Sequence, residues 1–144
     1  MEKYTDVIHL INYLNTELDS LYHQSSLKLG MSDSVSIVLY SLCDLGNGCL
    51  LSDIYKNSGI SKQTVNSAVR KLEADEIIYL ELSDGKKKKV LLTDKGKGYI
   101  EETAARIRRA ETDAFGSWRE EDVRTYIRLM EKYNDCFREQ IKKL

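Results

Sequence analysis

The sequence predicts a mainly helical protein with one small β-hairpin. The chain has 144 residues and no proline, so no pyrrolidine ring interrupts a helix anywhere along it. Apolar residues recur every three or four positions near both ends, which is typical of amphipathic helices. In the middle, the β-rich stretch Ile77–Leu82 and the stretch Val90–Leu92 flank an Asp-Gly turn, which is typical of a hairpin. A chain of this length is expected to form about one domain.

The two ends, residues 1–30 and 117–144, are predicted to be long helices with apolar heptad seams. The first seam consists of Val7, Ile11, Leu14, Leu18 and Leu21. The second consists of Val123, Ile127, Met130, Asn134, Phe137, Ile141 and Leu144. Ser117 and Glu120 have the spacing of a capping box and predict the start of the last helix. One small monomer can hardly cover both seams, so we expect a dimer interface built from both ends, with an intramolecular bundle as the alternative.

Residues 32–93 predict three short helices followed by the hairpin. Ser32 is expected to begin the first helix, and the Gly46–Gly48 turn ends it. The second helix ends near Asn57–Gly59, and Ser61 caps the third. A short turn between two helices defines a helix-turn-helix, and a following hairpin makes it a winged helix. Residues 94–115, capped by Thr93 or Asp94, are predicted to form one linking helix.

The composition favours a globular protein, with 42% hydrophobic and 31% charged residues. We expect no membrane partner, because no apolar run approaches the roughly 18 residues of a membrane span. The N-terminus does not resemble a signal peptide, and three cysteines at no metal-ligand spacing favour a reducing, cytoplasmic setting. His9 and His23 would lie about 21 Å apart along one helix and cannot share a metal. No nucleophile–base pair, phosphate loop or paired carboxylates occur, so neither an enzyme nor a cofactor is expected.

Charge is distributed unevenly along the chain, although the net charge is only −1. The segment 62–109 carries 12 basic and 8 acidic residues, whereas the segment 1–61 carries 3 basic and 7 acidic ones. The third short helix has no acidic residue from Ser61 to Leu72, as contact with a polyanion requires. Its predicted exposed face is polar and basic, and it consists of Ser61, Lys62, Gln63, Thr64, Asn66, Ser67 and Arg70. Such side chains can bond base edges in the major groove and phosphates.

The hairpin is the second candidate DNA-binding element. Four consecutive lysines, Lys86, Lys87, Lys88 and Lys89, follow its turn. Because side chains alternate along a strand, about half of the four can face one surface. A lysine run alone is more often a solvated turn, but beside a base-reading helix it predicts the second half of a surface for double-stranded DNA.

These motifs together resemble the MarR (multiple antibiotic resistance regulator) family of transcription factors. The resemblance rests on the runs Ser58–Val65, Val69–Glu73 and Asp84–Gly96 and covers nearly the whole chain. It implies a homodimer on a palindromic operator, with two recognition helices in successive major grooves and two wings in minor grooves. It also implies a repressor that a small-molecule effector or an oxidant releases from DNA. No cysteine stands near the start of the first helix, where redox-sensing relatives have one.

Three residues depart from the family pattern. Lys86 replaces the usual wing arginine, Glu76 replaces a glycine, and Tyr55 replaces an alanine. The resemblance places the effector pocket between the first helix, the Ser32–Leu45 helix and the helix after Thr93. The candidate lining residues are the tyrosines Tyr13, Tyr22, Tyr40, Tyr55 and Tyr99. The alternative function is a winged-helix module for protein interaction, which would favour acidic or apolar residues on the recognition face.

Overall fold

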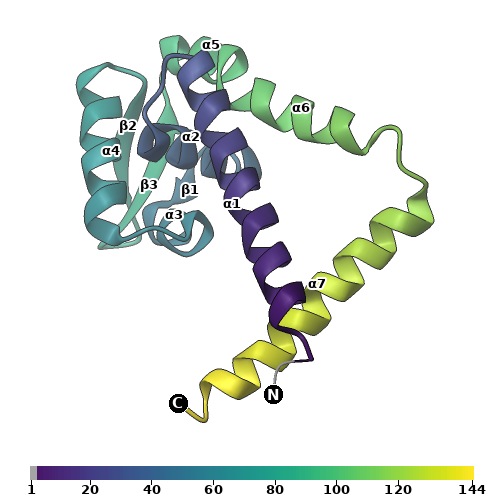
Figure 1. Ribbon diagram of the computed structural model, residues 1–144. Coiled ribbons are helices and arrows are strands. Elements are labelled where there is room, and N and C mark those ends of the chain that lie inside the picture. Colours follow the sequence, from purple (N-terminus) through teal and green to yellow (C-terminus); the bar gives the residue numbers. More distant parts are fainter. Residues whose placement is uncertain (1–2) are drawn as a thin grey trace. The chain divides into compact units, whose positions relative to one another are not determined.

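The computed structural model describes residues 3–144 and confirms the mainly helical fold with a winged helix-turn-helix (Figure 1). Its elements are, in order, α1 (Thr5–Lys28), α2 (Asp33–Leu45), β1 (Cys49–Leu50), α3 (Leu51–Ser58), α4 (Lys62–Ala74), β2 (Ile78–Ser83), β3 (Lys87–Leu92), α5 (Asp94–Glu102), α6 (Ala104–Phe115) and α7 (Glu120–Ile141). The chain packs as two compact units, of which the first ends at Arg108 and the second begins at Arg109. The winged helix, from α2 to β3, lies in the first unit.

Three hydroxyl side chains cap the starts of α2, α4 and α5. Ser32 and Ser61 do so as predicted, and Thr93 is the cap of the two, Thr93 or Asp94, that the sequence allowed. The Ser32 hydroxyl oxygen accepts a hydrogen bond from the backbone N–H of Val35 at the start of α2. Ser61 does the same for Thr64 in α4, and Thr93 for Gly96 in α5. Each bond satisfies an N–H group that has no partner within its own helix.

The sheet has three strands in the order β1-β3-β2, all antiparallel. The β2–β3 hairpin is the predicted one, and its register pairs Ile78 with Leu92 and Ser83 with Lys87. Strand β1 was not predicted, because two residues are too few for a periodic pattern. It is held against β3 by two further bonds, one from the Gly48 N–H to the Val90 carbonyl and one from the Leu92 N–H to the Asn47 side-chain oxygen.

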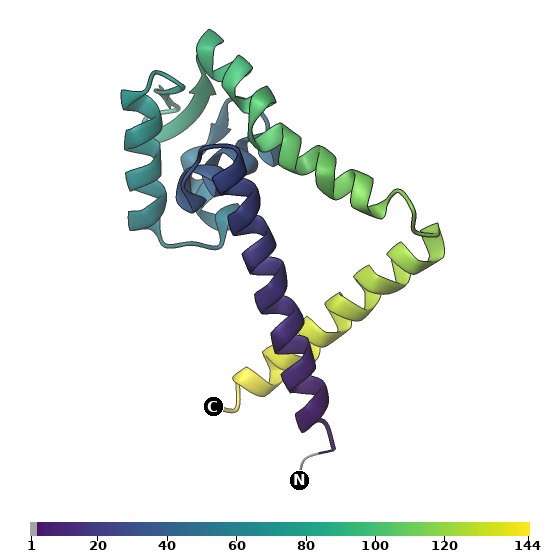
Figure 2. The ribbon, with the colours of Figure 1, turned by 45° about the horizontal axis from the view of Figure 1, so that its top comes forward.

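One apolar core lies between the helices of the winged helix and its sheet. Its most deeply buried apolar side chains come from α2, α3, α4, β2, β3 and α6, and they are Val38, Leu39, Leu42, Ile54, Val65, Leu72, Ile78, Val90 and Ala104. Helix α4 packs against α2 and β2 and lies at the outer edge of the winged helix (Figures 1 and 2). Because the core holds one side of α4 in place, its other side remains open to solvent.

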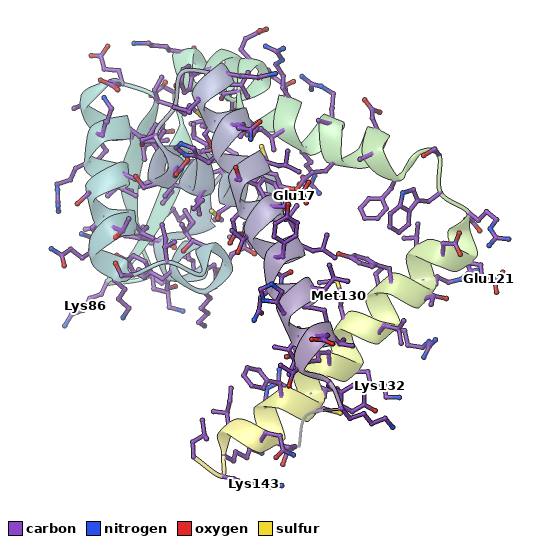
Figure 3. The ribbon with its side chains drawn as sticks, in the orientation of Figure 1. Glu17, Lys86, Glu121, Met130, Lys132 and Lys143 are labelled. Carbon is purple, nitrogen blue, oxygen red and sulfur yellow. The ribbon has the colours of Figure 1, made fainter. Side chains whose placement is uncertain are left out.

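The two terminal helices bury little of their apolar surface. In α1, every described residue up to Gln24 is exposed, and only Ser26 near its end is buried. Helix α7 has no buried residue. Met130 and Lys132 point to opposite sides of α7 (Figure 3), as their separation of two residues along a helix requires. Residues 1 and 2 of the predicted 1–30 helix lie outside the described residues.

The predicted linking helix 94–115 is wrong as one continuous element, because it breaks at Thr103. There the backbone leaves helical geometry, with φ −125° and ψ −97°, and α5 and α6 lie on either side. The Thr103 hydroxyl donates to the Tyr99 carbonyl at 2.7 Å. Side-chain bonds of this kind compete with the helical ladder and bend helices.

The predicted capping box at Ser117 is also wrong. Helix α7 begins at Glu120 with Arg119 at the N-cap position, and no side chain bonds the cap. Ser117 instead lies in a tight turn, in which the Trp118 N–H donates to the Phe115 carbonyl. The Trp118 ring packs edge-on against Phe115, with ring centroids 5.0 Å apart, and against Tyr126 at 5.8 Å. Aromatic contacts therefore accompany this turn in place of the predicted cap.

Candidate nucleic-acid interface

The predicted recognition face lies on α4. Val65, Ala68, Val69 and Leu72 are buried against the core, which fixes the rotation of the helix about its axis. The opposite side is consequently exposed at Lys62, Gln63, Thr64, Ser67 and Arg70, and Asn66 is half-buried at its margin. No acidic residue occurs before Glu73 in this helix. The face therefore offers hydrogen-bonding and cationic groups without a negative charge that would repel a phosphate.

Several of these side chains hold one another in place. The Ser61 and Thr64 hydroxyl oxygens lie 2.8 Å apart, so the capping group and its neighbour form one pair. An Arg70 guanidinium nitrogen donates to the Ser67 hydroxyl at 3.3 Å. Within residues 3–144, the Gln63 side chain makes no hydrogen bond, and both ends of its amide remain available to a ligand. A Gln amide can bond adenine bidentately, and a guanidinium can bond guanine.

Tyr55 of α3 contacts two residues of this face, Lys62 and Asn66. The sequence did not predict these contacts. Its hydroxyl donates a hydrogen bond to the Asn66 side-chain oxygen. The Lys62 ammonium nitrogen lies 5.5 Å from the centroid of the Tyr55 ring, which is within the range of a cation–π contact. The departure from the family's alanine was the only signal in the sequence. The contact between Tyr55 and Asn66 joins α3 to α4, so the sequence of neither helix alone predicts it.

The wing carries the predicted lysines on its outer surface. Lys86 belongs to the turn and points away from the winged helix (Figure 3), while Lys87, Lys88 and Lys89 belong to β3. All four are exposed, and none forms an ion pair within the part of the chain that the structure describes.

The strand register separates these lysines. Lys87 and Lys89 lie on one face of the hairpin, where their cross-strand partners in β2 are Ser83 and Glu81. Lys88 lies on the other face, as Val90 does. Glu81 is the cross-strand neighbour of Lys89, and its negative charge partly offsets the positive potential on that face.

The junction between α4 and the wing is braced by the start of α5. The Thr93 hydroxyl donates to the Glu76 carbonyl at 2.6 Å, and the Lys95 ammonium donates to the Asp75 carbonyl at 2.9 Å. Glu76 itself has φ 59°, in the left-handed region. A glycine would be relaxed there, so glutamate costs on the order of 1 kcal/mol.

The five candidate pocket tyrosines lie on four different helices. Tyr13 and Tyr22 are exposed on α1, whereas Tyr40 of α2, Tyr55 of α3 and Tyr99 of α5 pack against the core. The Tyr55 hydroxyl faces α4 through its bond to Asn66. Their role as the lining of one effector pocket stays a prediction.

The cysteines and acidic groups give no sign of other chemistry. Burial, and after it the nearby Asp53 carboxylate, raises the pKa of the Cys49 thiol. Because the thiolate is the reactive form, this environment makes Cys49 a poor nucleophile. Among residues 3–144, no three His, Cys, Asp or Glu side chains gather where they could hold a metal ion. None of the helices in that range has the length and apolar character that crossing a bilayer requires.

Comparison with known proteins adds independent observations. The model of the MarR family matches residues 29–89, which span the winged helix from the end of α1 into β3. No curated protein has a sequence that matches this chain significantly.

Solved structures share the fold at low sequence identity. A MarR family regulator from Neisseria meningitidis is 17% identical with a TM-score of 0.78, and the match covers 99% of each chain. BpsR from Bordetella bronchiseptica is 23% identical with a TM-score of 0.67, covering 90% of this chain and 98% of the other. MepR from S. aureus, in complex with DNA, is 20% identical with a TM-score of 0.68, covering 90% and 96%. The winged helix of this chain therefore matches the model of the MarR family over residues 29–89, and the chain shares its fold with these MarR-family regulators.

Proposed function

We propose that this protein is a homodimeric transcription regulator that binds a palindromic operator in double-stranded DNA. The observation that carries the proposal is the exposed face of α4, which bears Gln63, Asn66 and Arg70 and has no acidic residue before Glu73. The proposed arrangement places α4 in the major groove, where these side chains read base edges. The wing lysines would bind the phosphate backbone or the minor groove beside it.

The dimer is proposed from the uncovered faces of α1 and α7. Their apolar seam side chains are about half exposed, for example Leu14 at 52% and Phe137 at 51%. Helices of this kind are stabilised mainly by packing of the apolar face, and a second copy of the chain would supply that packing. Two copies would then present two α4 helices to two half-sites.

The proposed regulation is repression that a small-molecule effector relieves. Two of the solved structures support this: BpsR is described by the regulation of its DNA binding by 6-hydroxynicotinic acid, and MepR was solved bound to DNA. The candidate effector site is the set of tyrosines near α1, α2 and α5.

A salt titration of DNA binding tests the proposal directly. Replacing Lys86, Lys87, Lys88 and Lys89 by alanine removes the wing charge, and the exposed turn contributes little to stability. Each lost phosphate contact should reduce the slope of log affinity against log salt by about 0.9, so we expect a decrease of about two per protomer. Affinity for random and cognate DNA should fall alike, because phosphate contacts carry no sequence information.

An unchanged slope would show that the wing does not contact DNA. If the unmodified chain also failed to bind DNA at low salt, the protein-interaction module would become the better function. A control with Lys142 and Lys143 replaced by alanine removes charge outside the proposed DNA interface of α4 and the wing. Its slope of log affinity against log salt should match that of the unmodified protein.

A further inference from the structure

We infer that Tyr55 sets the base preference of the recognition helix by turning the Asn66 side-chain oxygen toward α3, so that the amide nitrogen is the end presented to DNA. This inference rests on the proposed binding of DNA through α4. An asparagine side chain has one acceptor oxygen and two donor hydrogens on its nitrogen. When both ends are free, it bonds adenine bidentately, donating to N7 and accepting from the exocyclic amine. In this protein one end is already occupied within the chain.

The occupied end is the Asn66 oxygen, which accepts the hydrogen bond of the Tyr55 hydroxyl. Both residues are half-buried, so this bond lies under the recognition face and partly out of water. A bond between partly buried groups is costly to leave unmade, which favours its retention when DNA binds.

The direction of this bond is supported by Lys62. Its ammonium nitrogen lies 5.5 Å from the centroid of the Tyr55 ring. A cation over the ring draws electron density from it, which makes the phenol hydroxyl a better donor and a poorer acceptor. The Asn66 oxygen therefore faces Tyr55, and its nitrogen is the end left for the DNA.

A side chain that presents its donor nitrogen to the groove selects a different base. In the major groove guanine presents two acceptors, N7 and O6, and thymine presents one, O4. Adenine offers N7 but also an amine that a donor cannot bond. The base contacted by Asn66 is therefore guanine or thymine, and adenine is disfavoured there. Tyr55 acts as a positioning residue, since it sets this preference through Asn66 without contacting DNA.

The test is selection of bound sequences from a random DNA library with the full-length chain and its variants. Asn66→Ala identifies the operator position that residue 66 reads, because base preference is lost at that position. The unmodified protein should favour guanine or thymine there. Tyr55→Phe keeps the ring but releases the Asn66 oxygen, so adenine should rise about tenfold relative to guanine and thymine at that position alone.

Two variants separate positioning from a purely structural role. Asn66→Asp still accepts the Tyr55 bond but cannot donate. It should fold normally, bind every DNA sequence more weakly because its carboxylate repels phosphates, and lose the guanine or thymine preference among the sequences that it still selects. Tyr4→Phe removes an exposed hydroxyl at the N-cap position of α1 and should leave the selected sequence unchanged. Thermal unfolding of each variant measures the structural effect separately, and loss of stability alone would not shift one base position.

An adenine preference in the unmodified protein would overturn the inference, as would identical selected sequences for Tyr55→Phe and the unmodified protein. Either result would leave the proposed DNA binding intact. If the unmodified protein selected no sequence at all, the proposed function itself would be overturned, and this inference with it.

Discussion

The winged helix and the two terminal helices use similar apolar residues with opposite results. Val38, Ile54 and Val90 in the winged helix are 0% exposed. Ile127 and Phe137 in α7 are 50% and 51% exposed, although they belong to a regular heptad seam. The winged helix completes its core within one chain, whereas α1 and α7 leave their apolar faces uncovered. Periodicity therefore predicts that a face will pack, but it does not say whether its partner belongs to the same chain.

This difference has a functional reading. A domain that folds around its own core can hold the α4 face rigidly before any partner arrives, and preorganised contacts lose less entropy on binding. In the proposed dimer, association through the uncovered helix faces would set the spacing of two such domains.

The largest effect is expected from charge on the uncovered face of α7. Replacing Ile127 and Phe137 by aspartate should weaken the proposed dimer by about 100-fold or more, because charged side chains cannot be buried unpaired. Sedimentation velocity at micromolar concentration measures the dissociation. DNA binding should be lost in parallel, since each protomer reads half a site. Lys132→Asp, on the opposite side of α7 from Met130, is the control and should remain dimeric. A monomeric unmodified protein would refute the dimer.

Gly96→Ala is expected to destabilise the packing of α5 on the winged helix. A Cβ atom at Gly96 would lie 1.9 Å from the Ile77 carbonyl oxygen, so α5 or the start of the wing must move. We expect a loss of about 3 kcal/mol in the free energy of unfolding, the upper end of the usual cost of overpacking. Chemical denaturation at fixed protein concentration measures it.

Gly98→Ala is the matched control for this substitution. Gly98 lies in the same helix, and no atom lies within 4 Å of the position of its Cβ. Alanine should stabilise α5 there by about 0.5–1 kcal/mol, since glycine is the poorer helix former. Equal destabilisation by both substitutions would contradict the close packing of Gly96 on Ile77.

The recognition face is tested without disturbing either core. Gln63→Ala and Arg70→Ala should each cost about 1–3 kcal/mol in binding free energy on the cognate operator and less on random DNA. Both residues are exposed, so unfolding should be nearly unchanged. Titration of both DNAs by fluorescence anisotropy measures the difference. Equal losses on the two DNAs would show that these side chains contact phosphate and do not read bases.

The smallest effect concerns the turn between α4 and β2. Glu76→Gly should raise the free energy of unfolding by about 1 kcal/mol, because φ 59° is unstrained only for glycine. Asp75→Gly is the neighbouring control, and it should destabilise, because Asp75 has φ −82° and pairs with Lys71 at 3.2 Å. Thermal unfolding of both variants distinguishes them. A loss of stability in Glu76→Gly would mean that the glutamate side chain contributes more than its backbone strain.

Local signals determined much of this fold. The hydroxyl residues Ser32, Ser61 and Thr93 begin their helices as predicted, and Gly59 ends α3 with φ 70°. These features depend on a residue and its neighbours within one turn of chain, so they can be read directly from the sequence. The exposure of Lys62, Gln63, Thr64, Ser67 and Arg70 also followed from the sequence, because burial of the apolar stripe fixes what the other side presents. Asn66 was expected on the same exposed face and is half-buried, because it lies at the margin of the stripe.

The tertiary structure alone decided the features that join distant segments. Strand β1 exists because β3 offers a free edge to Cys49–Leu50, and α7 starts at Glu120 beside an aromatic cluster, not at the capping box expected from Ser117. The bond between Tyr55 and Asn66 joins the two helices of the helix-turn-helix. Each depends on how elements pack, and that packing sums many weak contacts that no local pattern encodes. The sequence could therefore predict which side chains α4 presents, while only the packed structure shows which end of Asn66 remains for a partner.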